Sequence, residues 1–69
     1  MWKINHTSFD SGFTTLDYPR NREEALEAWE FWKAKGFSNC LLTLYRPCGR
    51  KVRDYYSETK KETDYEEDD

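Results

Sequence analysis

The stretch from Asn21 to Phe37, NREEALEAWEFWKAKGF, constrains the fold most, because its beginning, its periodicity and its end all indicate one helix. Asn21 is a favourable N-cap, and Glu24 can return a hydrogen bond to the Asn21 backbone N–H to complete a capping box. At the other end, Gly36 can adopt the left-handed conformation that ends a helix. We therefore expect a helix of about four turns.

The two sides of this helix differ in chemistry. At about 100° per residue, Ala25, Trp29 and Trp32 lie on one line, which we expect to pack against a sheet. The opposite side carries an acidic stripe, and Phe31 projects from its shoulder. The stripe consists of Glu23, Glu27 and Glu30. Two interpretations stay open for these residues: a solvated face with a marginal core ring, or contacts with a partner.

The length of 69 residues allows one small domain, with one sheet face packed on one helix and no internal active-site cavity. Hydrophobic residues make up only 36% of the chain, but 17% of the chain is aromatic, so a few large rings must supply most of the core. The candidate core rings are Trp2, Trp29, Trp32 and Phe13.

Three segments have the composition of strands. Met1–Ser8 alternates Trp2, Ile4 and His6 with polar residues, and Phe13–Tyr18 is rich in aromatic and β-branched residues. Ser38–Tyr45 is the third, with Cys40, Leu42 and Leu44 on the side expected to face the helix. The sequence thus predicts an α+β fold: one helix on a three-stranded antiparallel sheet, in the order strand, strand, helix, strand. Lys51–Ser57 is either a short fourth strand at the sheet edge or an extended arm.

Charge is distributed unevenly along the chain. Residues 1–56 hold nine Lys and Arg against seven Asp and Glu, whereas residues 57–69 hold two against seven. We therefore expect one domain over residues 1–57 and a disordered acidic tail over residues 58–69. A pI near 5.1 argues against direct nucleic-acid binding, which needs a basic surface. It favours a partner protein that presents a basic surface.

The sequence contains no arrangement typical of catalysis. His6 is the only histidine and has no evident acid partner, and no phosphate-binding loop or nucleophile elbow is present. Cys40 and Cys48 are too few for a zinc site, so we expect two reduced thiols, with a disulfide as the alternative. We predict a protein that is not an enzyme and that needs no cofactor or metal. Without a signal peptide or an apolar span of about 20 residues, neither secretion nor membrane insertion is expected.

A basic cluster surrounds the turn predicted at Pro47. It consists of Arg46, Arg50, Lys51 and Arg53. Arginine side chains can pair bidentately with carboxylates, so this cluster is a candidate contact with an acidic patch on a partner protein.

The chain resembles the small proteins with which T7-like phages inhibit host bacterial RNA polymerase. The similar pieces, in order, are the aromatic-led first strand from Trp2, the EALE run Glu24–Glu27, Gly36 with Phe37, and Arg46–Cys48. The resemblance implies a three-stranded antiparallel sheet with one helix, which binds the jaw region of the polymerase largest subunit and blocks promoter-complex formation. It also implies that Arg46 is a contact. The family's other arginine, two residues earlier, is replaced here by Leu44.

Three functional hypotheses follow. The first is a phage-encoded inhibitor of host RNA polymerase, acting in the host bacterial cytoplasm with Arg46 as anchor and the acidic stripe or tail as second contact. The second is a phage anti-defence protein that mimics the charge of DNA and inhibits a CRISPR, restriction or other nuclease system through its tail. The third is a host-encoded or viral interaction module without inhibitory function, in which Phe31 and the exposed rings near Tyr45, Tyr55 and Tyr56 form a dimer or scaffold contact.

Overall fold

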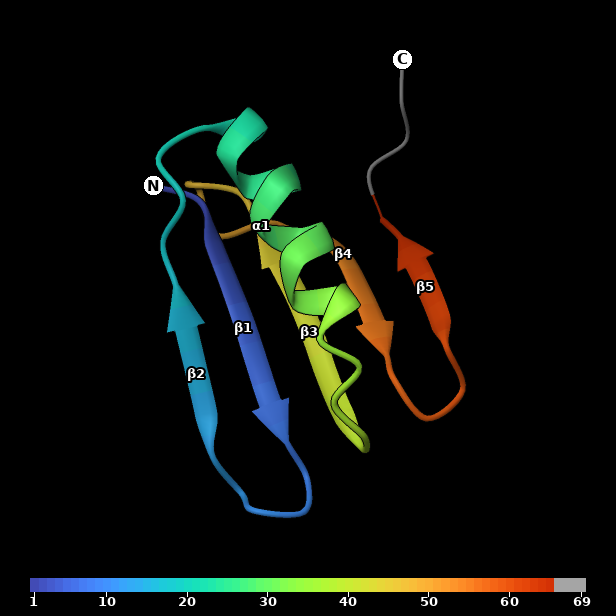
Figure 1. The fold of residues 1–69 in the computed structure, drawn as a ribbon. Coiled ribbons are helices and arrows are strands. Elements are labelled where there is room, and N and C mark those ends of the chain that lie inside the picture. The colour runs from blue at the N-terminus through green and yellow to red at the C-terminus, as the bar shows by residue number, and fades with distance from the viewer. Residues whose placement is uncertain (66–69) are drawn as a thin grey trace.

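The computed structural model describes residues 1–65, which form one helix and a five-stranded antiparallel sheet (Figure 1). The strands are β1 (Lys3–Ser8), β2 (Thr14–Asp17), β3 (Cys40–Tyr45), β4 (Lys51–Tyr56) and β5 (Lys61–Asp64), and helix α1 (Arg22–Ala34) follows β2. Their order across the sheet is β2-β1-β3-β4-β5, with α1 lying across one face. The α+β class and the helix on an antiparallel sheet are confirmed, but the sheet is wider than predicted.

The ends of α1 follow from the sequence signals with one change. The Asn21 side chain accepts a hydrogen bond from the Glu24 N–H at 2.9 Å, as expected of an N-cap. The Glu24 carboxylate, however, accepts from the Arg20 N–H at 3.2 Å and not from the Asn21 N–H. Gly36 has a φ of 67°, the left-handed conformation that lets the chain leave the helix for β3.

The core lies between α1 and the middle of the sheet. Ile4 faces Leu44, and His6 faces Leu42, across the β1–β3 pair, so alternate residues of both strands point to the helix. Trp29 is completely buried against them. The buried cluster comprises Trp2, Ile4, Ala25, Trp29, Leu42, Leu44 and Val52. The predicted inward faces of the first and third strands are therefore confirmed.

Phe13 was a predicted core ring, and this prediction is wrong, because 74% of the residue is exposed. It immediately precedes β2, the outermost strand of the sheet. Helix α1 contacts β1 and β3, and no second helix among the described residues covers β2. Trp32 is only half-buried, beside the fully buried Trp29.

The acidic tail is the largest correction. The prediction of disorder from residue 58 onward is wrong, because Lys61–Asp64 forms β5, which pairs with β4 along its whole length. As a result β4 is an inner strand and not the sheet edge. The segment has almost no apolar residues, but its helix-facing carboxylates meet cations from other elements, so charge pairing takes the place of hydrophobic alternation. Residues 66–69 of the predicted tail lie outside the described residues.

The face of the sheet that points away from α1 has no helix over it among residues 1–65. Lysine side chains lie over tyrosine rings there, Lys3 at 4.7 Å from the Tyr45 ring centroid and Lys51 at 5.0 Å from that of Tyr65. These contacts shield aromatic surface that would otherwise be in water.

Among residues 1–65, no helix is long and apolar enough to cross a membrane.

Truncating the chain at Ser57 tests the structural role of β5. The truncation removes the strand and leaves Lys33 and Arg53 without the carboxylates of Glu62 and Asp64. We expect the free energy of unfolding to fall by about 1–3 kcal/mol, measured by chemical denaturation. A chain ending at Tyr65 keeps β5 and serves as the control. Equal stability of the full chain and the chain ending at Ser57 would contradict this role.

Candidate functional site

The turn between β3 and β4 presents the first two predicted contact residues, Arg46 and Arg50. The Arg46 N–H donates to the Arg50 C=O at 2.9 Å, and the Gly49 N–H donates to the Arg46 C=O at 2.8 Å. Pro47 occupies the second position of this tight turn, where its fixed φ is favourable. The backbone that carries both arginines is therefore held by two hydrogen bonds and a proline.

The Arg46 side chain is positioned by Trp2. Its guanidinium carbon lies 5.4 Å from the Trp2 ring centroid, over the ring. Trp2 is itself only 6% exposed, and its backbone N–H donates to the Pro19 C=O at 3.0 Å. Stacking on a fixed ring orients a guanidinium and restricts its rotamers before any partner arrives. The turn lies at the same end of the sheet as the N-terminus and the beginning of α1 (Figure 1).

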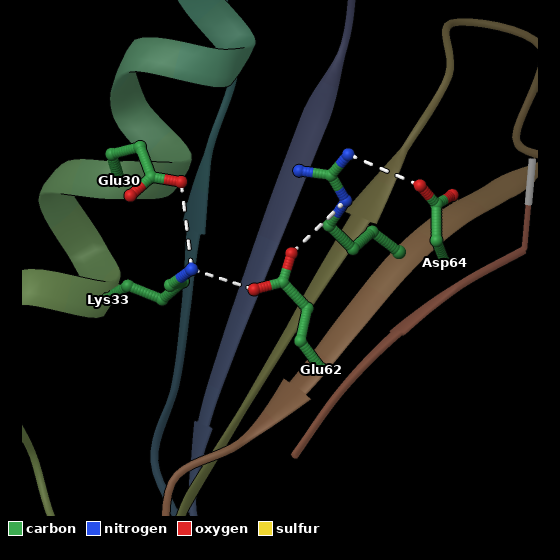
Figure 2. Close-up of polar contacts among 5 residues, drawn as sticks. Glu30, Lys33, Glu62 and Asp64 are labelled. Carbon is green, nitrogen blue, oxygen red and sulfur yellow. Dashed lines mark hydrogen bonds and ion pairs between the residues drawn. The ribbon is translucent and has the colours of Figure 1, made fainter. Parts of the chain in front are cut away.

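Arg53, the third predicted arginine, lies apart from this turn. A register shift between Leu44 and Tyr45 marks an irregularity in the β3–β4 pair, and Arg53 faces Leu44 on the helix side of the sheet. Its Nε lies 3.4 Å from Glu62 Oε2, and its Nη2 lies 3.4 Å from Asp64 Oδ2 (Figure 2). The side chain is only 23% exposed, so its charge is matched within the fold.

Glu62 joins this pair to the helix. Lys33 Nζ on α1 lies 2.7 Å from Glu62 Oε1 and 3.6 Å from Glu30 Oε2 (Figure 2). The hydrogen bond to Glu62 raises the pKa of Lys33 above its ordinary value, and the charges of Glu62 and Glu30 raise it further. We call these five residues the charge network: Glu30, Lys33, Arg53, Glu62 and Asp64. It connects α1, β4 and β5 with alternating charges.

The acidic stripe lies on the outer side of α1, and Glu23, Glu27 and Glu30 are all exposed. Glu30 is partly neutralised by Lys33 in the charge network. Phe31 is 59% exposed, in an edge-to-face arrangement with Trp32 and with Lys35 Nζ at 4.5 Å from its centroid. The stripe and Phe31 thus share the exposed side of the helix.

His6 is buried in an aromatic setting. Its ring stacks on Trp32 at a centroid distance of 5.0 Å and touches Phe37 at 5.1 Å. Burial lowers the pKa of His6 below its ordinary value of 6.5, so the ring is neutral at pH 7. His6 and Cys40 also line a small cavity of about 80 Å³ beside Phe37. Among the described residues, no three acidic, histidine or cysteine side chains are grouped to hold a metal ion.

Sequence reasoning placed Arg46 and Arg50 together but missed two features. The first is Trp2 as the ring under Arg46, which links the first and the last segments of the resemblance through two residues 44 positions apart in the chain. The second is the charge network, because nothing in the local pattern of Lys61–Asp64 indicates a strand. The opposite charges of Arg53 and of Glu62 and Asp64 indicate a strand pair only once the β4–β5 register is known.

A scan against protein-family models and searches among curated proteins and solved structures find no match to this chain.

His6 should make stability depend on pH. Its pKa in the folded protein lies below that in the unfolded chain, so the unfolded chain binds a proton more readily, and stability falls as the pH drops through 6.5. His6→Phe keeps a ring against Trp32 but cannot titrate. Thermal denaturation between about pH 7.5 and 5.5 should show a smaller loss of stability for His6→Phe than for the natural chain. Identical losses would contradict this assignment.

Proposed function

We propose that this protein is a stoichiometric inhibitor of bacterial RNA polymerase, encoded by a phage and active in the host cytoplasm. The partner is the jaw region of the polymerase largest subunit, and the anchor is Arg46. The observation that carries the proposal is the arrangement of Arg46, which stacks on Trp2 at the end of β3 in a proline-containing turn. The same residues carry the sequence resemblance to the polymerase inhibitors of T7-like phages.

Pre-organisation supports Arg46 as the binding residue. An arginine that loses little rotamer freedom on binding keeps more of its interaction energy, and arginine is enriched among residues that dominate interfaces. Arg50 is exposed in the same turn. It can make the second contact in place of the family's other arginine, which Leu44 replaces in this chain. Both would pair with carboxylates on the polymerase surface.

The carboxylates of Glu58, Glu62 and Asp64 support a role of the predicted tail in the fold. Glu62 and Asp64 neutralise Lys33 and Arg53, and Glu58 accepts a hydrogen bond from the Asn39 N–H at 3.2 Å. We assign the main contact to the basic turn, where Arg46 stacks on Trp2, and the secondary contact to the acidic stripe.

The test is binding of the tagged full chain to purified bacterial RNA polymerase, together with promoter-dependent transcription. Arg46→Glu should weaken binding by about 30-fold or more, which corresponds to about 2 kcal/mol for an interface anchor, and should relieve inhibition. Arg46→Lys, which keeps the charge but loses the planar fork, should weaken binding less.

The matched control is Lys60→Glu, the same charge reversal at an exposed position beyond the other end of β4. It should bind as the natural chain does. Thermal denaturation of each variant shows that the fold is retained. Unchanged binding of a folded Arg46→Glu variant, or no binding of the natural chain to the polymerase, would contradict the proposal.

Charge mimicry of DNA is the second candidate, favoured by the exposed row of Glu23 and Glu27 on α1. In that case the target is a nuclease of a CRISPR or restriction system. The double substitution Glu23→Gln, Glu27→Gln should then abolish inhibition of the nuclease, measured by DNA cleavage, whereas Arg46→Glu should not. Under the polymerase proposal, the double substitution should reduce polymerase binding by less than about tenfold, because rim charges contribute little.

A further inference from the structure

Strand β2 is an edge of the sheet whose free hydrogen-bonding groups can be assigned. The Ser8 N–H donates to the Phe13 C=O at 2.9 Å, and the β1–β2 register continues from there with Thr15 opposite His6. In an antiparallel pair the residues alternate between those that bond the neighbour and those that do not. Thr15 and Asp17 therefore direct their backbone groups to β1, while those of Thr14 and Leu16 point away from the sheet.

The two edges of the sheet are protected to different degrees. In β5, three of the four residues are charged (Lys61, Glu62 and Asp64), which is typical of an edge that resists pairing. In β2, which reads TTLD, there is no lysine or proline, and its register with β1 is regular. Exposed apolar side chains lie in and beside it. They are Phe13 at 74%, Leu16 at 45% and Tyr18 at 52% exposure.

We propose that β2 pairs antiparallel with β2 of a second copy of this chain, about a two-fold axis at Thr15, so that the two sheets join into one of ten strands. In this register Thr14 lies opposite Leu16 of the second copy. The outward backbone groups of these two residues in each copy then make four hydrogen bonds. The inference does not rest on the polymerase proposal, because Arg46 takes no part in it.

The side chains fit a second copy in this register. Thr15 lies opposite Thr15 of the second copy, a favourable cross-strand pair, and Asp17 lies opposite Phe13 of the second copy. No two like charges face each other, although Asp17 is the one charged residue of β2. Leu16 and Phe13 lose exposed surface. Because the contact is a single short strand from each copy, the dimer should be weak and should form only as the concentration rises.

The experiment is sedimentation velocity of the full chain over micromolar to millimolar concentrations. Two variants address β2 directly. Thr14→Pro removes an outward N–H without disturbing the bonds of Thr15 to β1, and Leu16→Lys places a charge beside the two-fold axis. The matched control is Thr63→Lys, which adds the same lysine to β5 at the other edge of the sheet. Circular dichroism confirms that each variant is folded.

The natural chain and Thr63→Lys should shift toward about twice the 8.4 kDa mass of one chain, with both β2 variants staying monomeric. A natural chain that stays monomeric throughout would overturn the proposal, as would a dimer that survives both β2 substitutions. If the natural chain stays monomeric and Thr14→Pro also loses polymerase binding, the proposal is overturned, and the β2 edge is assigned to pairing with a strand of the polymerase instead.

Discussion

The burial of Trp29 between α1 and the sheet is the contact on which the structure depends. Trp29 is the largest completely buried side chain, and Ile4 and Leu44 beneath it are also completely buried. A helix of 13 residues can cover only the middle of a five-stranded sheet, and α1 accordingly contacts β1 and β3. The outer strands must be held by other contacts, and these contacts differ between the two edges of the sheet.

On one side, the charge network holds β4 and β5. Glu62 lies between Lys33 of the helix and Arg53 of the sheet, so the acidic strand is fixed by opposite charges on two elements. These side chains are about one quarter exposed, and each pair alone contributes about 1 kcal/mol or less. A connected set shares the entropic cost of ordering its members, and the β4–β5 hydrogen bonds add to it. At the other edge, the Trp32 Nε1–H of α1 donates to the Asp17 carboxylate of β2 at 3.4 Å, and among residues 1–65 no further strand pairs with β2.

This division also separates the surfaces available for recognition. The charge network pairs Arg53 with the carboxylates of β5, whereas Arg46 and Arg50 lie in the β3–β4 turn. Trp2 links this surface to the core, because its ring is buried with Leu44 and also lies under the Arg46 guanidinium. A partner that binds Arg46 would therefore meet a side chain already fixed by the packing of α1 on β1.

The sequence predicted the parts of the fold that rest on local signals. The N-cap at Asn21, the end at Gly36 and the inward face of Cys40, Leu42 and Leu44 follow from capping and alternation, which act over a few residues. Phe13 and β5 were beyond such reasoning. The local sequence around an aromatic residue is similar in an edge strand and in a central strand. Whether the ring is buried depends on which strands α1 covers.

For the candidate site, the sequence indicated which residues carry charge but not how they pair. Arg46, Arg50 and Arg53 are close in the chain, yet the β3–β4 irregularity and the position of β5 decide that Arg53 lies beside the carboxylates of β5. Long-range register sets that outcome, and the composition of the acidic segment gives no indication of it.

Amide hydrogen exchange of β5, followed by NMR, tests most directly the claim that the acidic segment belongs to the fold. The Tyr65 N–H donates to the Val52 C=O at 2.8 Å, and the register gives the Thr63 N–H a partner in β4 as well. The amides of Glu62 and Asp64 point outward. We expect slow exchange at Thr63 and Tyr65 and fast exchange at Glu62 and Asp64. Uniformly fast exchange at all four amides would contradict this expectation.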